Sequence, residues 1–183
     1  MKNNSHEKLL NLFKKQGGFF NNNLIIKKNV ENSFGIESTN DIPPNTILID
    51  VPHNLLIPVD EVQNLSMCNN IFKNVFLKTV TSNSDYLNFH PLMSNSSELE
   101  KINSVIKNNQ NLYKNFLIKH KEFISLTDEK KKIELLSSTR AIFLKEYNKK
   151  FFMPIMDFVN YHYDGLSYSI GKGGNVYLKS KKL

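Results

Sequence analysis

The spacing of apolar residues changes twice along the chain, and this change constrains the fold more than any other feature. Short apolar runs separated by Asn-rich or Pro-containing turns occur between about residues 20 and 58 and again after residue 151. Such runs are typical of short β-strands. Between about residues 59 and 147, apolar residues recur at intervals of three and four, which indicates helices. The order strands, helices, strands predicts an α+β fold with a helical insertion.

The local patterns predict individual elements. Residues 5–16 have leucines and a phenylalanine at helical spacing, and Gly17-Gly18 ends the pattern, so we expect an N-terminal helix. Strands are expected near residues 24–26, 34–36, 46–49, 151–153, 168–170 and 176–178, and helices near 99–106, 113–117 and 133–141. The segment from Gly171 to Asn175 lacks the GK[ST] ending of a phosphate loop and predicts a hairpin instead.

Composition restricts the class of protein. The 183 residues, 40% of them hydrophobic, suit one compact domain with at most a small inserted lobe. The polar N-terminus lacks a secretory signal, and no apolar run approaches the roughly 20 residues of a membrane span. The single cysteine, Cys68, excludes an internal disulfide framework, and the histidines lack metal-ligand spacing. We expect a soluble, cytoplasmic protein without a metal site and without membrane partners.

The net charge of +7 raises the question of a nucleic-acid partner. The lysines are scattered, however, and the densest run, Lys130–Lys132, directly follows Asp128 and Glu129. Such a run is typical of a solvated helix face. We therefore do not expect nucleic acid to be the partner.

Two segments resemble a known family. The first runs from Asn32 through Phe34-Gly35 to Val51-Pro52 and resembles the opening of a SET domain, in which a glycine-bearing strand precedes a turn, a strand and Val-Pro. The second, Ser138–Phe143 followed by Met153–Asn160, is similar to the "S-R-x-F … P-x-x-D-x-x-N-H" signature of SET methyltransferases with a helical insertion. The chain thus resembles that group, which includes Rubisco large-subunit methyltransferase and the actin-histidine methyltransferase.

The resemblance implies one SET domain over residues 1–183, with a β fold of short strands, an N-terminal helix and an inserted helical subdomain. It divides the chain into an N-terminal SET part of about residues 20–58, a helical insertion of about 60–135 and a C-terminal SET part of about 136–183. In the family, a further segment then delivers the catalytic tyrosine. We expect the sequence to be truncated before that segment, so no catalytic residue is assigned.

The implied cofactor is S-adenosylmethionine (SAM), and its expected contacts come from the two segments. The cofactor-binding residues are predicted to be Asn32, Ser33, Phe34, Gly35, Arg140, Asp157, Asn160 and Tyr161. Gly35 would let the backbone approach a ligand, and Phe34 would offer an apolar face to adenine or to the methionyl chain. The alternative is that both residues belong to a packed strand with a bulge.

Arg140 is the only arginine among the 24 cationic residues. A guanidinium grips a carboxylate with two parallel hydrogen bonds, which an ammonium cannot do. The matching arginine of the family contacts SAM, so the resemblance assigns Arg140 to the carboxylate of the cofactor. An ordinary ion pair on the helix surface, for example with Glu146, is the alternative.

The segment after Pro154 supplies the remaining predicted contacts. The amide of Asn160 offers a donor and an acceptor, and the resemblance assigns it to the amino and carboxylate groups of SAM. Asp157 is expected to contact the cofactor or to act as a structural acceptor, and a simple turn residue is the alternative. Where the family has histidine after the asparagine, this chain has Tyr161.

Three functions follow from these observations. The first is a SAM-dependent protein methyltransferase that transfers a methyl group to a lysine side chain of a protein, with histidine as the other possible target. The second is a SET-like module that binds SAM or a partner protein without catalysis. The third is a basic protein that binds nucleic acid, with an affinity that falls steeply with salt. The sequence makes no prediction about the oligomeric state.

Overall fold

The computed structural model of the chain describes residues 5–28, 34–62, 70–82, 91–93, 98–99, 101, 110–159 and 166–181. It divides into two compact units. The first unit combines Met1–Asn83 with Arg140–Leu183, and the second unit is Ser84–Thr139. The chain therefore leaves the first unit after its first 83 residues and returns to it at Arg140.

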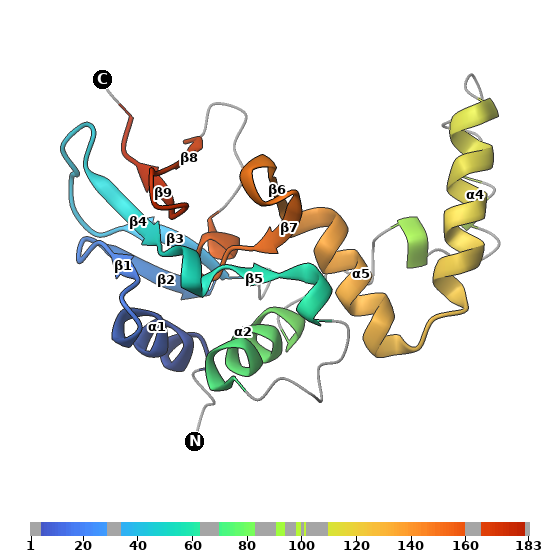
Figure 1. Ribbon diagram of the computed structural model, residues 1–183, viewed down its shortest axis with the longest axis horizontal. Coiled ribbons are helices and arrows are strands. Elements are labelled where there is room, and N and C mark those ends of the chain that lie inside the picture. The colour runs from blue at the N-terminus through green and yellow to red at the C-terminus, as the bar shows by residue number, and fades with distance from the viewer. Residues whose placement is uncertain are drawn as a thin grey trace. The chain divides into compact units, whose positions relative to one another are not determined.

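The first unit begins with helix α1 (Ser5–Lys15), as the sequence predicts. Leu9 and Phe13, four residues apart on one helix face, are fully buried. Gly17 ends the helix with a φ of 93°, a left-handed conformation that favours glycine. Helix α2 (Ile71–Ser82) lies beside α1 (Figure 1). The Oδ1 atom of Asn70 caps α2 by accepting hydrogen bonds from the first backbone N–H groups of the helix.

A four-stranded antiparallel sheet joins the two ends of the chain. Its strands are β1 (Phe19–Phe20), β4 (Ile47–Val51), β9 (Val176–Lys179) and β8 (Tyr168–Ile170), in this order across the sheet. Ile49 of β4 pairs with Leu178 of β9, and both are buried. The hairpin expected between the last two strands is confirmed, since β8 and β9 are adjacent and antiparallel.

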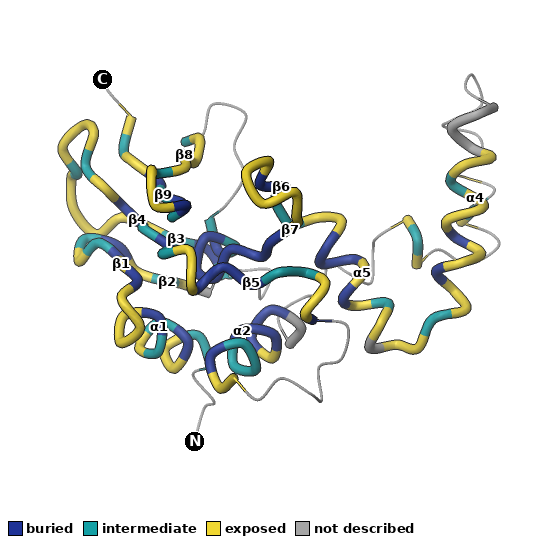
Figure 2. The backbone as a smooth tube through the Cα atoms, in the orientation of Figure 1, coloured by how far each residue is buried: buried dark blue, intermediate teal, exposed yellow. Residues whose placement is uncertain are grey.

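Two smaller sheets complete the first unit. Strands β2 (Leu24–Lys28) and β3 (Phe34–Ser38) form an antiparallel pair. Strands β5 (Ile57–Pro58), β7 (Lys149–Phe152) and β6 (Ile142–Leu144) form a three-stranded sheet with β7 in the centre. Phe152 of β7 meets Phe76 of α2 with ring centroids 6.0 Å apart, so α2 packs against this sheet. Buried residues from these strands and both helices form the core (Figure 2).

Short 3₁₀-helices connect several of these elements. They are η1 (His53–Leu55), η2 (Val59–Val62), η5 (Pro91–Met93), η6 (Lys145–Tyr147) and η7 (Met156–Phe158). The last of them, η7, lies in the segment that resembles the SET signature.

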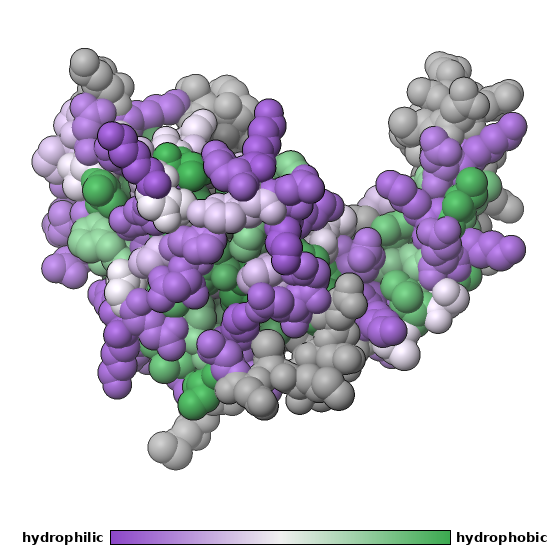
Figure 3. Space-filling view, in the orientation of Figure 1, coloured by the Kyte–Doolittle hydropathy of each residue, from purple (hydrophilic) through white to green (hydrophobic). Residues whose placement is uncertain are grey.

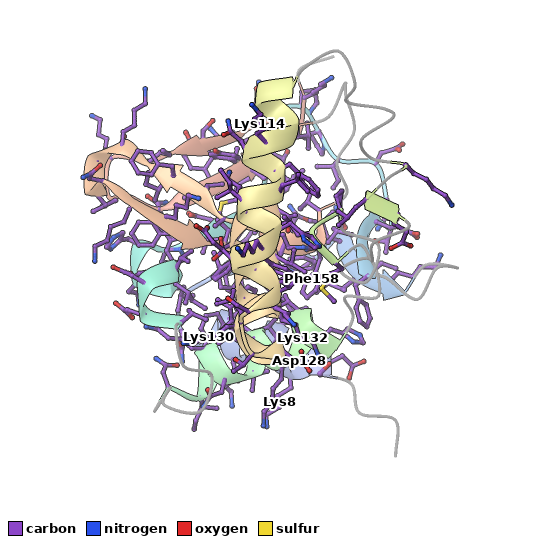
Figure 4. The ribbon with its side chains drawn as sticks, turned by 90° about the vertical axis from the view of Figure 1, so that its right-hand side faces the viewer. Lys8, Lys114, Asp128, Lys130, Lys132 and Phe158 are labelled. Atoms are coloured by element: carbon purple, nitrogen blue, oxygen red, sulfur yellow. The ribbon has the colours of Figure 1, made fainter. Side chains whose placement is uncertain are left out.

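The second unit contains helix α4 (Gln110–Ile124) and all but the last residue of helix α5 (Asp128–Arg140). Phe123 of α4 and Leu135 and Leu136 of α5 are buried. Near the start of α5, Lys130 and Lys132 are exposed and lie on opposite sides of the helix in the view of Figure 4. Lys131, the middle residue of the lysine run, is instead half-buried and pairs with Asp128 at 3.6 Å, so only the two outer lysines lie on a solvated face.

The α+β class is confirmed, because helices and short antiparallel strands form the described structure. One boundary is wrong: the helical pattern was expected to continue to about residue 147, but Ile142–Leu144 form strand β6. Asn148, with a φ of 50°, turns the chain so that β6 pairs with β7, and this pairing overrides the local spacing. Strand β1 was not predicted. The helix expected at 99–106 lies mostly outside the described residues.

None of the described helices has both the length and the apolar character needed to cross a membrane. Hydrophilic residues cover most of the described part of the face shown in Figure 3, with apolar residues between them. This distribution agrees with lysines that are scattered along the sequence.

Candidate functional site

The guanidinium of Arg140 is directed at the segment that contains η7. Arg140 is the last residue of α5 and is half-buried. Its Nη1 atom donates a hydrogen bond to the backbone carbonyl of Asp157, 17 residues further along the chain. A guanidinium has five N–H donors in a fixed plane, and this bond uses one of them. Arg140 and Asp157, both predicted to contact the cofactor, are therefore adjacent in space.

The carboxyl group of Asp157 is in an unusual environment. Its Oδ2 atom is buried and has no hydrogen-bond partner among the described residues, although the residue as a whole is only half-buried. Desolvation raises the pKa of this carboxyl from its ordinary 3.8 to about 7, and the positive charge of Arg140 acts in the opposite direction. Burial thus outweighs the attraction of the neighbouring cation. A buried acceptor without a partner is rare in proteins and suits a donor supplied by a ligand.

The backbone before η7 is strained. Ile155 has a φ of 72° and a ψ of −46°, a conformation that is a clear outlier for a β-branched residue. The other described non-glycine residues with positive φ are Asn45 and Asn148, and asparagine tolerates this region. The side chain of Ile155 is fully buried, and its carbonyl accepts a hydrogen bond from the N–H of Phe158 at 3.0 Å. Core packing therefore holds the turn that directs Asp157 toward Arg140, and such strain often marks functional sites.

Strand β3 reaches the same segment through an aromatic contact. The ring of Phe34, the first residue of β3, meets the ring of Phe158 in η7 edge to face, with centroids 5.9 Å apart. Phe158 is buried, whereas Phe34 is half-buried and keeps part of its surface accessible. Phe34 also contacts the imidazole of His6 from α1, with ring centroids 4.6 Å apart. Phe34 and Arg140 thus both contact η7, which itself contains Asp157.

Gly35 is buried in the middle of a regular ladder. It pairs with Lys27 of β2, and the register between β2 and β3 runs without a shift from Leu24–Ser38 to Lys28–Phe34. The strand bulge that was considered as the alternative for Phe34 and Gly35 is therefore not present. Phe34, which precedes Gly35 in β3, contacts Phe158 of η7. The predicted glycine-bearing strand therefore does lie against η7.

The structure brings Phe34, Arg140 and Asp157 together around η7, with Gly35 next to Phe34 in β3. The predicted contacts Asn32, Ser33, Asn160 and Tyr161 lie outside the described residues. Sequence reasoning gave no role to Phe158, to the strained Ile155 or to His6. Phe158 belongs to the quoted motif and could have been found there. The contact of His6 joins residues 28 positions apart, and no local pattern indicates it.

The arrangement can bind a small zwitterionic molecule. The guanidinium of Arg140 suits a carboxylate, and the unpartnered Oδ2 of Asp157 suits an ammonium group. The exposed part of the Phe34 ring suits an apolar or aromatic group. Among the described residues, no three histidine, cysteine, aspartate or glutamate side chains gather as metal ligands would. The described part of the site thus offers a guanidinium, a carboxyl group and an aromatic ring to a ligand.

Comparison with solved structures identifies the fold as the SET type. One match is the SET domain of LSMT bound to lysine and AdoHcy (S-adenosylhomocysteine), with a TM-score of 0.52 and 15% identity, covering 96% of this chain and 50% of that chain. A second is the same domain bound to methyllysine and AdoHcy, with a TM-score of 0.51, 16% identity and coverage of 96% and 49%. A third is Rubisco LSMT bound to AdoMet (SAM), with a TM-score of 0.50, 16% identity and coverage of 97% and 50%.

These matches confirm the resemblance to SET domains at the level of the fold. The present chain spans about half the length of the matched chains. No family model matches the sequence. No curated protein matches it significantly either.

Proposed function

We propose that this chain binds SAM and acts as a protein methyltransferase that modifies a lysine side chain. The observation that carries the proposal is the convergence of Arg140, Asp157 and Phe34 on η7 within a SET-type fold. The amino-acid end of SAM is a zwitterion with one carboxylate and one ammonium group. An adjacent guanidinium and buried carboxyl match these two charges, and neither group alone would do so.

Each residue has a distinct task in this proposal. The planar guanidinium of Arg140 binds the carboxylate of SAM, and its hydrogen bond to the carbonyl of Asp157 fixes its orientation. The Oδ2 atom of Asp157 accepts a hydrogen bond from the ammonium group, which supplies the partner that this buried atom lacks. Phe34 packs against the adenine or the methionyl chain. Asn32, Ser33, Gly35, Asn160 and Tyr161 complete the proposed set of contacts.

SAM, when bound, supplies an electrophilic methyl group on a sulfonium. The contribution of the protein is to hold the cofactor in one orientation and to exclude water around the target amine, since desolvation favours the neutral, nucleophilic form of a lysine. Support for lysine as the target comes from the LSMT structures, which contain lysine or methyllysine. The helical part of about residues 60–135 is proposed to select the protein substrate.

Transfer of a labelled methyl group tests the proposed activity. The chain would be incubated with SAM carrying a tritiated methyl group and with a protein extract, and the protein fraction would then be hydrolysed to amino acids. The proposal predicts label in methyllysine, and much less label with the Arg140→Lys variant. Label in methylhistidine would mean that the target residue is histidine and not lysine, while methyl transfer itself would still be supported. SAM binding without any protein label would remove the catalytic part of the proposal and leave a binding module.

A further inference from the structure

His6 lies next to the candidate site but belongs to a different element. It occupies the first turn of α1, near the N-terminus, whereas Phe34 opens β3 and Phe158 lies in η7. The imidazole of His6 and the ring of Phe34 have centroids 4.6 Å apart and planes inclined by 39°. Together with the edge-to-face contact between Phe34 and Phe158, this forms a chain of three rings from α1 to η7.

The Phe34 ring has two aromatic neighbours from two different elements. Phe158 is buried and meets Phe34 edge to face at 5.9 Å, which leaves the orientation of Phe34 partly open. His6 is the nearer of the two neighbours, with its ring centroid 4.6 Å from that of Phe34. A phenylalanine at the start of a strand has several staggered rotamers available, and packing against two neighbouring rings favours one of them. The accessible part of Phe34 therefore keeps a fixed direction before any ligand binds.

We propose that His6 is a positioning residue of the SAM site, which acts by holding the Phe34 ring ready for the cofactor. The inference rests on the proposed function, since it assumes that Phe34 contacts SAM. It adds α1 to the elements that build the site, because the N-terminal helix then contributes to affinity as well as to the core. Fixing one side chain in advance avoids its ordering cost on binding, which amounts to roughly a threefold to tenfold gain in affinity.

Four variants of the full chain test this role by isothermal titration with SAM. His6→Ala removes the ring, His6→Gln keeps a polar side chain without a ring, and His6→Phe restores an aromatic ring. Lys8→Ala is the matched control, because Lys8 lies in the same helix and is exposed at its surface (Figure 4). The Kd of SAM is expected to rise about threefold to tenfold for His6→Ala and His6→Gln, and to stay within about twofold of the native value for His6→Phe and Lys8→Ala.

A spectroscopic measurement separates positioning from a purely structural role. The Cε1–H resonance of His6, assigned by its loss in the His6→Phe variant, is expected to shift during a titration with SAM and to follow the same Kd as the calorimetric signal. A histidine that only stabilised α1 would not respond to the cofactor. If the His6→Ala chain does not fold, the comparison of His6→Gln with His6→Phe decides the question.

Several results would overturn the inference. They are native affinity in both His6→Ala and His6→Gln, a His6→Phe variant as weak as His6→Gln, or a His6 resonance that stays unchanged at saturating SAM. Failure of the native chain to bind SAM at all is a different result. It would remove the proposed function, and the positioning role of His6 with it.

Discussion

At the scale of single residues, the buried carboxyl of Asp157 opposes folding as long as no ligand is bound. Its pKa of about 7 in the folded chain lies above the ordinary 3.8 that we take for the unfolded chain. Between these two values the folded state holds a proton that the unfolded state has released. The stability from this group is therefore complete below pH 3.8 and is lost as the pH rises to about 7. A residue that destabilises the free protein in this way is typical of a binding site.

The first prediction follows from the direction of this pKa shift. Asp157→Asn keeps the shape of the side chain but removes the buried charge, so it should stabilise the ligand-free chain at pH 8 by about 1–3 kcal/mol. For a chain of this size the Tm should rise by roughly 2–4 °C per kcal/mol. At pH 5 the difference should be clearly smaller, because the folded chain already holds the proton, and it should disappear only below pH 3.8, where the unfolded carboxyl is protonated as well. Thermal unfolding monitored by circular dichroism at both pH values measures this.

The control for that experiment is Asp128→Asn. Asp128 lies at the start of α5 with 96% of its side chain exposed, and it forms only a loose ion pair with Lys131 at 3.6 Å. Its replacement should shift the Tm by little at either pH. A lower Tm for Asp157→Asn at pH 8 would mean that the Asp157 carboxyl stabilises the fold, which is the opposite of the predicted effect.

The same titration governs ligand binding, and this gives the second prediction. An ionised Asp157 binds an ammonium group more strongly than a protonated one, because the hydrogen bond is then charge-assisted, so a bound ammonium lowers the pKa of the carboxyl. The affinity for SAM should be greatest above pH 7 and fall by up to about tenfold per unit as the pH decreases below it. Isothermal titration between pH 5.5 and 7.5 measures this dependence. An affinity that is constant over this range would exclude Asp157 as the ammonium acceptor.

At the scale of elements, the turn that leads into η7 combines strain with burial. The positive φ of Ile155 costs about 1–3 kcal/mol. The fully buried side chain of Ile155 contributes more, since the loss of such a side chain typically costs about 2–5 kcal/mol. The free energy gained by burying the Ile155 side chain therefore exceeds the cost of its backbone conformation. This explains why the chain has isoleucine at a position where the backbone alone would favour glycine.

This comparison leads to the third prediction. Ile155→Ala and Ile155→Gly both remove the side chain, but only glycine also relieves the backbone. Both variants should be less stable than the native chain, and Ile155→Gly should be the more stable of the two by about 1 kcal/mol. Urea unfolding of the two variants measures the difference directly. If the free energy of unfolding of Ile155→Ala equalled or exceeded that of Ile155→Gly, the turn at Ile155 would carry no backbone strain.

The elements also show how far the sequence predicts the structure. Helix α1 and strands β2, β3, β4, β7, β8 and β9 were predictable, because each shows its own apolar spacing and is bounded by glycine, proline or asparagine. Strand β6 was not, because Phe143 and Leu144 continue the helical spacing of α5 and only the pairing with β7 decides their structure. The two-residue strand β1 is too short to show a period.

The candidate site was predictable only in part, for the same physical reason. The motifs named Arg140, Asp157 and Phe34 as residues of one site. Three features of the site depend on contacts between distant parts of the chain. They are the hydrogen bond from Arg140 to the backbone of Asp157, the strain at Ile155 and the contact between His6 and Phe34. No local pattern in the sequence contains this information. The roles of the predicted contacts, including those outside the described residues, stay predictions.

At the scale of the whole molecule, a cofactor that binds only the folded chain must stabilise it. At a SAM concentration 100 times the Kd, the gain in unfolding free energy is about 2.7 kcal/mol. For a chain of 183 residues this corresponds to a rise in Tm of roughly 5–10 °C. Differential scanning calorimetry with and without SAM is the fourth test. Phe34→Ala, which removes the ring proposed to contact SAM, should reduce this rise, whereas replacement of the exposed Lys8 by alanine should not.

The central claim is that one planar guanidinium, at the end of α5, binds the carboxylate of SAM. Isothermal titration of SAM into the native chain and into Arg140→Lys and Lys132→Ala tests it most directly, because lysine keeps the charge of Arg140 but loses its planar fork, and Lys132 is an exposed cation of the same helix. The claim predicts binding by the native chain and by Lys132→Ala, and a Kd about 10- to 100-fold higher for Arg140→Lys. Equal affinities for the native chain and Arg140→Lys would contradict it.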